Sequence, residues 1–255
     1  MADNNQKIAL ITGGSRGLGR DMALQLAKKG IDVVITYHSK KAEAEEVVAT
    51  IKNLGRKAAT LQLDVSKSNE FETFVKNFQN ILSTEFGADK FSSLVNNAGV
   101  GLHADFANTT EEQFDSMMNI HLKAPFFLTQ KLLPFMSDGG SIVNISSGLT
   151  RFSFTGYEAY ATMKGAVETL TKYQAKFLGN RGIRVNVVAP GAIETDFGGG
   201  ALKNDKDLNN MISSMTALGR TGLPDDIGGV VAFLCSDDSK WVNAQRIEVT
   251  GGMLI

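Results

Sequence analysis

Three residues in the middle of the sequence have the types and spacing needed to transfer a proton to a carbonyl oxygen. Tyr160 and Lys164 are four residues apart, so on a helix they lie one turn apart on the same face. A free tyrosine has a pKa of about 10, and an adjacent ammonium group favours the phenolate and lowers that pKa. Ser147 follows the apolar run 142–145, at the carboxyl end of a predicted strand, where α/β sheets bind ligands. These residues are therefore candidates for catalysis, with Tyr160 as the proton donor.

A glycine-rich turn near the start of the chain has the features of a phosphate-binding loop. Residues 12–19 directly follow the apolar run 8–12 and precede a segment of helical period, 18–29. Glycines let the backbone turn tightly and approach a pyrophosphate, which binds the free N–H groups of a helix N-terminus. The spacing is Gly-x-x-x-Gly-x-Gly, and not the Gly-x-Gly-x-x-Gly of the commoner dinucleotide fold. The predicted cofactor contacts here are Gly13, Ser15, Arg16, Gly17, Leu18 and Gly19.

The end of the second predicted strand indicates which dinucleotide binds. An acidic residue there would hold the adenosine ribose hydroxyls, but residues 37–41 read Tyr-His-Ser-Lys-Lys. No carboxylate is present to repel a 2′-phosphate, and Arg16 could bind that phosphate with two N–H groups, with Lys40 or Lys41 adding charge. The sequence therefore favours NADP(H). Alternatively, Arg16 and the lysines are only solvated. The predicted contacts at this strand end are Tyr37, His38 and Ser39.

Two further turns follow predicted strands. Asp64 ends the run 59–63, where its carboxylate could accept a hydrogen bond from the adenine amino group while the Val65 N–H reaches the ring. Alternatively, Asp64 caps the following helix. Residues 96–99 read Asn-Asn-Ala-Gly and suit backbone contact with the cofactor, although a plain turn would look similar. The predicted contacts in this second turn are Asn97, Ala98 and Gly99.

Alternating strands and helices must position these residues. Short β-branched runs alternate with segments of helical period, which predicts βαβ units and a parallel sheet covered on both faces. The predicted strands are 8–12, 33–36, 59–63, 93–96, 142–145 and 185–188, and the predicted helices are 18–29, 42–54, 70–82, 110–136 and 159–178. Residues 191–222 interrupt the alternation, and they contain three consecutive glycines and a polar segment. Such an insertion usually lies over the active site of a one-domain enzyme, the alternative being a solvated surface loop.

Composition excludes several classes of protein. The chain has 255 residues, 43 % of them hydrophobic, and a net charge of -1. A domain of this size buries roughly three quarters of its unfolded surface and needs neither disulfides nor a metal. The near-neutral charge argues against a nucleic-acid partner, and no apolar stretch reaches the roughly 20 residues of a membrane span. The polar start and the single Cys235, which we expect in helix packing, favour a cytoplasmic protein acting on a small molecule.

The sequence resembles the short-chain dehydrogenase/reductase family over essentially the whole chain, 1–255, as a single domain. The matching positions, in chain order, are the glycine turn, Asp64, the run 96–99, Asn119, Ser147, Tyr160, Lys164, Pro190 and Gly191. The resemblance implies a Rossmann-type doubly wound parallel α/β sheet of about seven strands with helices on both faces. It also implies a substrate-binding insertion around 191–222.

The resemblance also implies roles for individual residues. Ser147 would hydrogen-bond the carbonyl oxygen, Tyr160 would protonate it, and Lys164 would bind the nicotinamide ribose and tune Tyr160. Asn119 would hold a helix distortion and a water that relays protons through Lys164. The family spacing to the tyrosine selects Ser147 over Ser146. Further cofactor contacts are implied at Pro190, Gly191, Ile193 and Thr195, with Val188 beside the nicotinamide.

The histidines are expected to contribute little. His121 is two residues from Asn119, and residues two apart on a helix do not share a face, so we expect His121 outside the site. His103 follows the fourth predicted strand and is interpreted as a residue of the rim.

The substrate is predicted from the apolar residues around Ser147. Phe152, Phe154, Tyr157 and Phe197 suit a small free ketone with an aromatic or alkyl group, although they could instead only pack a lid. The family branch that acts on acyl carrier protein usually has basic residues before the fifth strand, where this chain has Asp138. A carbonyl reductase is therefore predicted. A 3-oxoacyl-[acyl-carrier-protein] reductase and a non-catalytic NADP(H)-binding regulator are the alternatives, and the family implies a homotetramer paired through the helices 110–136 and 159–178.

Overall fold

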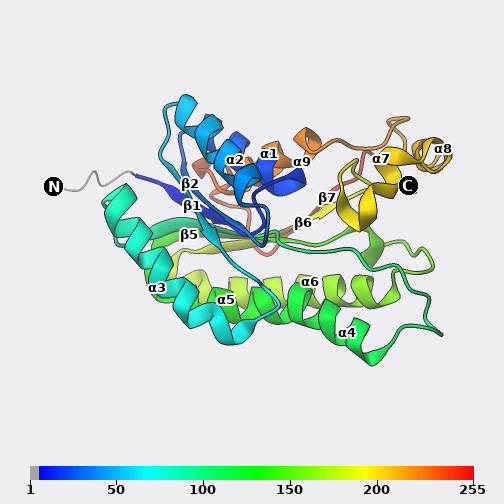
Figure 1. The fold of residues 1–255 in the computed structure, drawn as a ribbon, viewed down its shortest axis with the longest axis horizontal. Coiled ribbons are helices and arrows are strands. Elements are labelled where there is room, and N and C mark those ends of the chain that lie inside the picture. The colour runs from blue at the N-terminus through cyan, green and yellow to red at the C-terminus, as the bar shows by residue number, and fades with distance from the viewer. Residues whose placement is uncertain (1–5) are drawn as a thin grey trace.

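A parallel sheet lies at the centre of the structure, a computed structural model that describes residues 6–255 (Figure 1). Within these residues the sheet has seven strands in the order β3-β2-β1-β4-β5-β6-β7, and every neighbouring pair is parallel. The strands are β1 Ile8–Ile11, β2 Asp32–Tyr37, β3 Ala58–Gln62, β4 Phe91–Asn96, β5 Met136–Ile145, β6 Arg184–Pro190 and β7 Arg246–Val249. The chain starts at β1 and winds outward in both directions, which confirms the predicted doubly wound fold.

Both faces of the sheet are buried because the strands are apolar on both sides. Alternate side chains of β1 enter different cores: Ala9 and Ile11 pack on one face, and Ile8 and Leu10 pack on the other. Helices α1 (Gly17–Lys28), α2 (Lys41–Asn53) and α9 (Asp225–Leu234) cover the first face, and α3 (Phe71–Ile81), α5 (Ala124–Leu132) and α6 (Glu158–Leu178) cover the second (Figure 1). The sheet is thus a rigid layer whose strands all end at one edge.

The helices confirm most of the predicted pattern. Their bounds are α1 Gly17–Lys28, α2 Lys41–Asn53, α3 Phe71–Ile81, α4 Glu111–Met118, α5 Ala124–Leu132, α6 Glu158–Leu178, α7 Ala201–Asn204, α8 Lys206–Ser214 and α9 Asp225–Leu234. The single helix predicted over 110–136 is wrong, because a π-helical turn, Asn119–Lys123, separates α4 from α5. The Ala124 N–H bonds to the Asn119 carbonyl five residues back, which widens the helix at this point.

The segment 191–222 is more ordered than the sequence predicts, because it contains α7 and α8. Asp205 caps α8, accepting hydrogen bonds from the N–H groups of Asp207 and Leu208. The sequence gives little sign of α8 because Ile212 is its one buried residue. The position of strand β7 was not predicted either, because its four residues are all half-buried and do not form an apolar run.

Residues 1–5, part of the polar start for which no signal peptide is predicted, lie outside the described residues. Within residues 6–255, no helix combines the length and the apolar character needed to cross a membrane.

Candidate active site

The three predicted catalytic residues meet at the carboxyl edge of the sheet. Lys164 donates a hydrogen bond from Nζ to the carbonyl of Ile145, the last residue of β5, at 2.8 Å. The same Nζ lies 5.5 Å from the centre of the Tyr160 ring. Ser147 follows β5 by two residues, and its side chain lies close enough to Tyr160 to affect the pKa of the phenol. All three side chains are buried. The structure therefore brings together a hydroxyl, a phenol and an ammonium group.

The structure separates Ser147 from its neighbour Ser146. The Ser146 hydroxyl donates to Glu168 Oε1 at 2.7 Å, so it is part of a structural network. Glu168 also accepts from Thr150 and, at 2.8 Å, from Arg246. Ser147 Oγ instead accepts from the Leu149 N–H at 3.2 Å and keeps its own proton for a ligand or for Tyr160. The geometry thus agrees with the choice of Ser147.

Burial dominates the electrostatics of the pair on α6. It raises the pKa of Tyr160 well above its usual value, and the nearby Ser147 side chain only partly opposes this effect. Burial also lowers the pKa of Lys164 to about 7, so near neutral pH this amine is protonated only part of the time. The lowering of the Tyr160 pKa that is expected from Lys164 together with a nicotinium ring stays a prediction. Two groups enclosed together lose the solvation that stabilises both charged forms.

The glycine turn is packed so closely that side chains cannot replace its hydrogens. A Cβ at Gly19 would lie 2.1 Å from the Gly13 carbonyl oxygen, and one at Gly14 would lie 2.5 Å from Ile35 Cβ. Gly13 and Gly17 also have positive φ, at 69° and 54°. Asn97 fixes the turn to the end of β4 by donating from Nδ2 to the carbonyls of Thr12 and Gly13 at 2.9 and 3.0 Å.

The turn suits an anionic group. Arg16 is the N-cap of α1, and no side chain among residues 6–255 caps this helix. Its first turn also carries no acidic residue. The first backbone N–H groups of α1 are therefore left without side-chain partners, which is the arrangement that binds a phosphate. The residues present thus fit the pyrophosphate of a dinucleotide.

The cations predicted to bind a 2′-phosphate all lie at the surface. Arg16 is exposed and pairs with Asp196, Nη1 to Oδ2, at 3.3 Å. Lys40 and Lys41 pair with glutamates of their own helix, at 3.5 and 3.6 Å. Tyr37 is half-buried at the end of β2, and His38 and Ser39 beyond it are exposed. All three cations are exposed and paired with a carboxylate, so contact of any of them with a 2′-phosphate stays a prediction.

Asp64 forms a local turn and does not cap the following helix, because the N-cap residue of the 3₁₀ turn after it is Lys67 and that of α3 is Glu70. Its Oδ1 accepts hydrogen bonds from the Ser66 N–H and hydroxyl, at 3.0 and 2.7 Å. Although partial burial opposes them, these bonds hold the pKa of Asp64 below its usual value. Oδ2 lies 3.6 Å from His38 Nε2. The adenine contact at Asp64 and half-buried Val65 stays a prediction.

The remaining predicted cofactor residues lie along the same edge. The Ala98 N–H donates to Thr12 Oγ1 at 3.0 Å, and Leu18 packs against the core of the first face. Pro190 ends β6, and a Cβ on Gly191 would lie 2.8 Å from Thr250 Cα. Ile193 pairs with Gly222, and the Thr195 side chain is the one nearest to Gly17. The turn and the insertion therefore meet at Thr195.

The predicted substrate residues divide into two groups. Phe197 packs on the catalytic tyrosine candidate, with ring centres 5.7 Å apart. Phe152 and Phe154 pack on each other at 5.8 Å, and a Cβ at Gly148 would lie 2.8 Å from the Phe152 ring. Tyr157 contacts the ring of exposed His103 at 5.3 Å. Phe197 is thus the aromatic residue of the insertion that reaches Tyr160.

The expectation that His121 lies outside the site is wrong. Its ring is 1 % exposed, and its centre lies 5.0 Å from that of Tyr160 at an interplanar angle of 87°. Sequence spacing could have revealed this, because the buried residues before and after it recur every three or four positions. The stripe is Met117, His121, Ala124, Leu128 and Leu132. Half-buried Asn119 lies off the stripe, and its role stays a prediction.

Other features lie away from this edge. Cys235 is buried at the end of α9, and burial raises its pKa, in keeping with a packing role.

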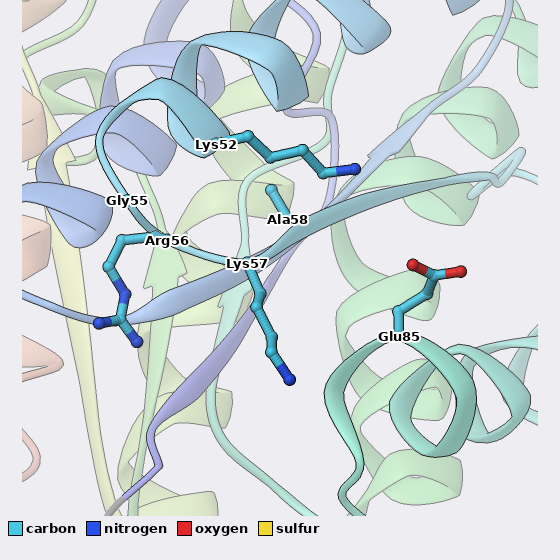
Figure 2. Close-up of a pocket in the computed structure, with 6 residues that line it drawn as sticks. All are labelled: Lys52, Gly55, Arg56, Lys57, Ala58 and Glu85. Carbon is cyan, nitrogen blue, oxygen red and sulfur yellow. The ribbon is translucent and has the colours of Figure 1, made fainter.

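A basic groove lies at the opposite edge, where β3 begins (Figure 2). Arg56 there is bound to Asp32 at 2.7 Å and Lys57 to the Phe86 carbonyl at 3.2 Å, so these cations already have partners. No three His, Cys, Asp or Glu side chains in residues 6–255 are grouped to hold a metal.

Comparisons with known proteins agree with this geometry. A family model described as Enoyl-(Acyl carrier protein) reductase matches residues 13–254. The 3-oxoacyl-[acyl-carrier-protein] reductase FabG of Staphylococcus epidermidis is 38 % identical over 249 residues, covering 97 % of this chain and 98 % of FabG. The hydroxynaphthalene reductase-like protein Arp2 of Metarhizium brunneum is 37 % identical over 257 residues, covering 96 % and 94 %. The crystal structure of the angucycline C-6 ketoreductase LanV with bound NADP is 37 % identical, with a TM-score of 0.92 and coverage of 97 % and 95 %.

Proposed function

The chain belongs to the short-chain dehydrogenase/reductase family, and we propose that it is an NADPH-dependent ketoreductase acting on a small free ketone that carries an aromatic or alkyl group. The observation that carries the proposal is the buried cluster of Ser147, Tyr160 and Lys164, with Phe197 of the insertion packed on Tyr160. Such a cluster places the phenol hydrogen that a ketone oxygen needs next to an aromatic side chain that can contact the rest of the ketone. The names of LanV and Arp2, both of which refer to reduction of aromatic compounds, support this substrate class.

The proposed chemistry assigns one task to each side chain. The Ser147 hydroxyl donates a hydrogen bond to the ketone oxygen and stabilises the negative charge that develops there. The Tyr160 hydroxyl gives its proton to that oxygen, which becomes the alcohol hydroxyl. Lys164, which is held in place by its hydrogen bond to the Ile145 carbonyl, stabilises the phenolate that remains. When bound, NADPH supplies the hydride that adds to the carbonyl carbon.

The raised pKa of Tyr160 suits this direction of reaction. A tyrosine that keeps its proton at working pH is ready to donate it, whereas alcohol oxidation needs the phenolate first. Lys164 beside it, with its pKa near 7, can then resupply a proton to the phenolate. Asn119 stays the proposed origin of the helix distortion that opens this region.

The proposed cofactor is NADP(H). Support comes from the uncapped N-terminus of α1, from the absence of a carboxylate at positions 37–39 and from exposed Arg16 in the turn. LanV, solved with NADP, is a further support. The proposed contacts are those predicted from the sequence, from Gly13 to Gly19, at 37–39, at Asp64 and Val65, at 97–99, and from Pro190 to Thr195.

A reductase of carrier-linked β-ketoacyl groups is the second candidate, and the identity to FabG favours it. Asp138, whose charge argued against an acidic carrier, pairs with Arg181 at 2.7 Å, so its charge is partly balanced. The aromatic residues at Tyr160 support the free ketone instead.

A homotetramer is also proposed, and the exposed Phe126 of α5 and Phe177 of α6 support association through these helices.

Kinetics with a panel of ketones tests the proposal. The purified protein with NADPH should reduce an aryl ketone with higher kcat/KM than a short β-ketoester or a carrier-linked β-ketoacyl substrate. Tyr160→Phe should lower kcat by roughly 10²–10⁴ while NADPH still binds, because it removes the proton donor. Tyr173→Phe, an exposed tyrosine on the same helix, is the matched control and should keep full activity. A hundredfold preference for the carrier-linked substrate would support the second candidate instead.

A further inference from the structure

His121 is a buried titratable group beside Tyr160 that the proposed chemistry does not use. It lies on the π-helical turn between α4 and α5, with the ring 1 % exposed. The ring makes contacts in two directions, to Tyr160 on α6 and to the backbone of Gly99 and Val100 after β4. It therefore connects the proposed proton donor to the loop that is predicted to contact the cofactor.

The contact with Val100 fixes the protonation of the ring. His121 Nε2 lies 2.9 Å from the Val100 carbonyl oxygen. Because a carbonyl oxygen only accepts, Nε2 carries the hydrogen and Nδ1 carries a lone pair. Burial, together with the positive charge of Lys164, lowers the pKa of His121 to about 3. The ring is thus neutral at any working pH, so it acts through its shape and position and not through its charge.

The contact with Gly99 shows how tightly the ring is held. A Cβ at Gly99 would lie 2.7 Å from His121 Cε1 and 3.2 Å from Nδ1, so the ring fills the space that any other residue would need. On its other side the ring meets Tyr160 edge to face, a geometry that stabilises aromatic pairs. Among residues 6–255, the charged or titratable groups that influence it are Tyr160 and Lys164, both from α6. The imidazole is therefore wedged between two parts of the site.

We infer that His121 is a positioning residue for the proposed reaction, which holds the Tyr160 ring in register with the 97–99 loop and with Ser147. The inference rests on the proposed function, and it concerns the ring contact. Proton transfer is sensitive to distance, so a displaced phenol loses rate even when the ketone and NADPH still bind. A displaced phenol also moves relative to Ser147, whose side chain lowers the Tyr160 pKa.

Two substitutions separate the ring contact from the Val100 bond. His121→Asn keeps a side-chain N–H but is too short to reach the Tyr160 ring, whereas His121→Phe keeps a ring of similar shape without the nitrogen atoms. We expect His121→Asn to lower kcat by about 10–100-fold with KM and the NADPH Kd within about threefold. His121→Phe should restore kcat to within about fivefold of the native enzyme. Ile120→Ala, a truncation on the same turn, controls for general destabilisation and should lower Tm without lowering kcat.

The pH profile distinguishes positioning from simple packing. In the direction of alcohol oxidation, the apparent pKa assigned to Tyr160 should shift in His121→Asn and stay unchanged in His121→Phe, because only the first variant removes the ring that holds the phenol in its buried position. Loss of folded protein alone would change the amplitude of the profile and not its midpoint.

Gly99→Ala supplies an independent perturbation of the same contact. Its methyl group should push the ring away from Tyr160 and lower kcat in the native background, but much less in the His121→Asn background, where space is available. Native kcat and an unshifted profile in His121→Asn would overturn the inference, as would equal losses in the asparagine and phenylalanine variants. If the native enzyme reduced no ketone at all, the proposed function itself would be wrong, so the two failures are distinct.

Discussion

The glycine turn and the segment 191–222 both flank the site, but different forces hold them. In the turn, the space at Gly14 and Gly19 is already occupied by other atoms, and the Gly13 backbone is among them. In the segment, Gly198 and Gly199 have positive φ and no atom within 4 Å of an added Cβ. Phe197 beside them is 45 % exposed. The turn is fixed by close packing of the backbone, whereas the middle of the segment is open.

The segment is anchored at its two ends by polar side chains. Asn209 on α8 donates from Nδ2 to Glu194 Oε1 at 2.8 Å and to Thr221 Oγ1 at 3.1 Å. The Thr221 hydroxyl also donates to Glu194. These hydrogen bonds hold the pKa of Glu194 below its usual value, so the network stays ionised near neutral pH. Because the anchors lie away from Phe197, residues in the middle of the segment can change without disturbing the fold, which suits a region that selects the substrate.

The largest expected difference is in NADPH affinity, between a glycine-to-alanine substitution in the glycine turn and one in the segment. Gly19→Ala places a methyl group 2.1 Å from the Gly13 carbonyl oxygen, so the turn must distort, and NADPH affinity should fall by about 100-fold. Gly199→Ala meets no neighbour and costs only the strain of positive φ, about 1–2 kcal/mol. Fluorescence titration with NADPH and thermal unfolding measure both effects. Equal NADPH affinity in the two variants would contradict the distinction.

The preference for NADPH over NADH is the second test, and it concerns the residues beside the glycine turn. Tyr37→Asp places a carboxylate where the 2′-phosphate is proposed to bind, which repels the phosphate and can hold the ribose hydroxyls of NADH. The ratio of kcat/KM for NADPH to that for NADH should fall by about 10–100-fold and reverse the preference. Tyr37→Asn, which has the size of aspartate without its charge, should shift the ratio far less. A native enzyme that uses NADH as well as NADPH would show that the interpretation of Arg16 is wrong.

The smallest expected effect lies in the substrate segment. Phe197→Ala removes an aromatic contact that is partly exposed in the free protein, so KM for an aryl ketone should rise by about 5–30-fold and KM for a short aliphatic ketone by less. The NADPH Kd should stay constant, because Phe197 is not a proposed cofactor contact. Leu218→Ala, 70 % exposed near the end of the segment, is the control. Equal changes for both ketones would show that Phe197 only packs the segment.

The sequence by itself determined the parts of the molecule that depend on residues close together in the chain. The apolar runs place β1 to within one residue of its observed end, because a strand buried on both faces needs side chains that are apolar on both sides. The glycine spacing predicted a turn before α1, because only glycine tolerates the backbone contacts found there. The four-residue spacing of Tyr160 and Lys164 predicted that they share a face of α6.

Only the tertiary structure decided which of these residues touch one another. Ser146 is engaged by Glu168, and Glu168 by Arg246, which is 78 residues further along the chain. The contact of His121 with Tyr160 depends on how the turn after α4 packs against α6. The spacing of Asn119 and His121 predicted that they lie on different faces of the helix, but it did not say which of the two faces inward. The direction of the Tyr160 pKa depends on burial among groups from separate elements. Periodicity and spacing describe neighbours along the chain, whereas burial, partners and charge come from residues that folding brings together.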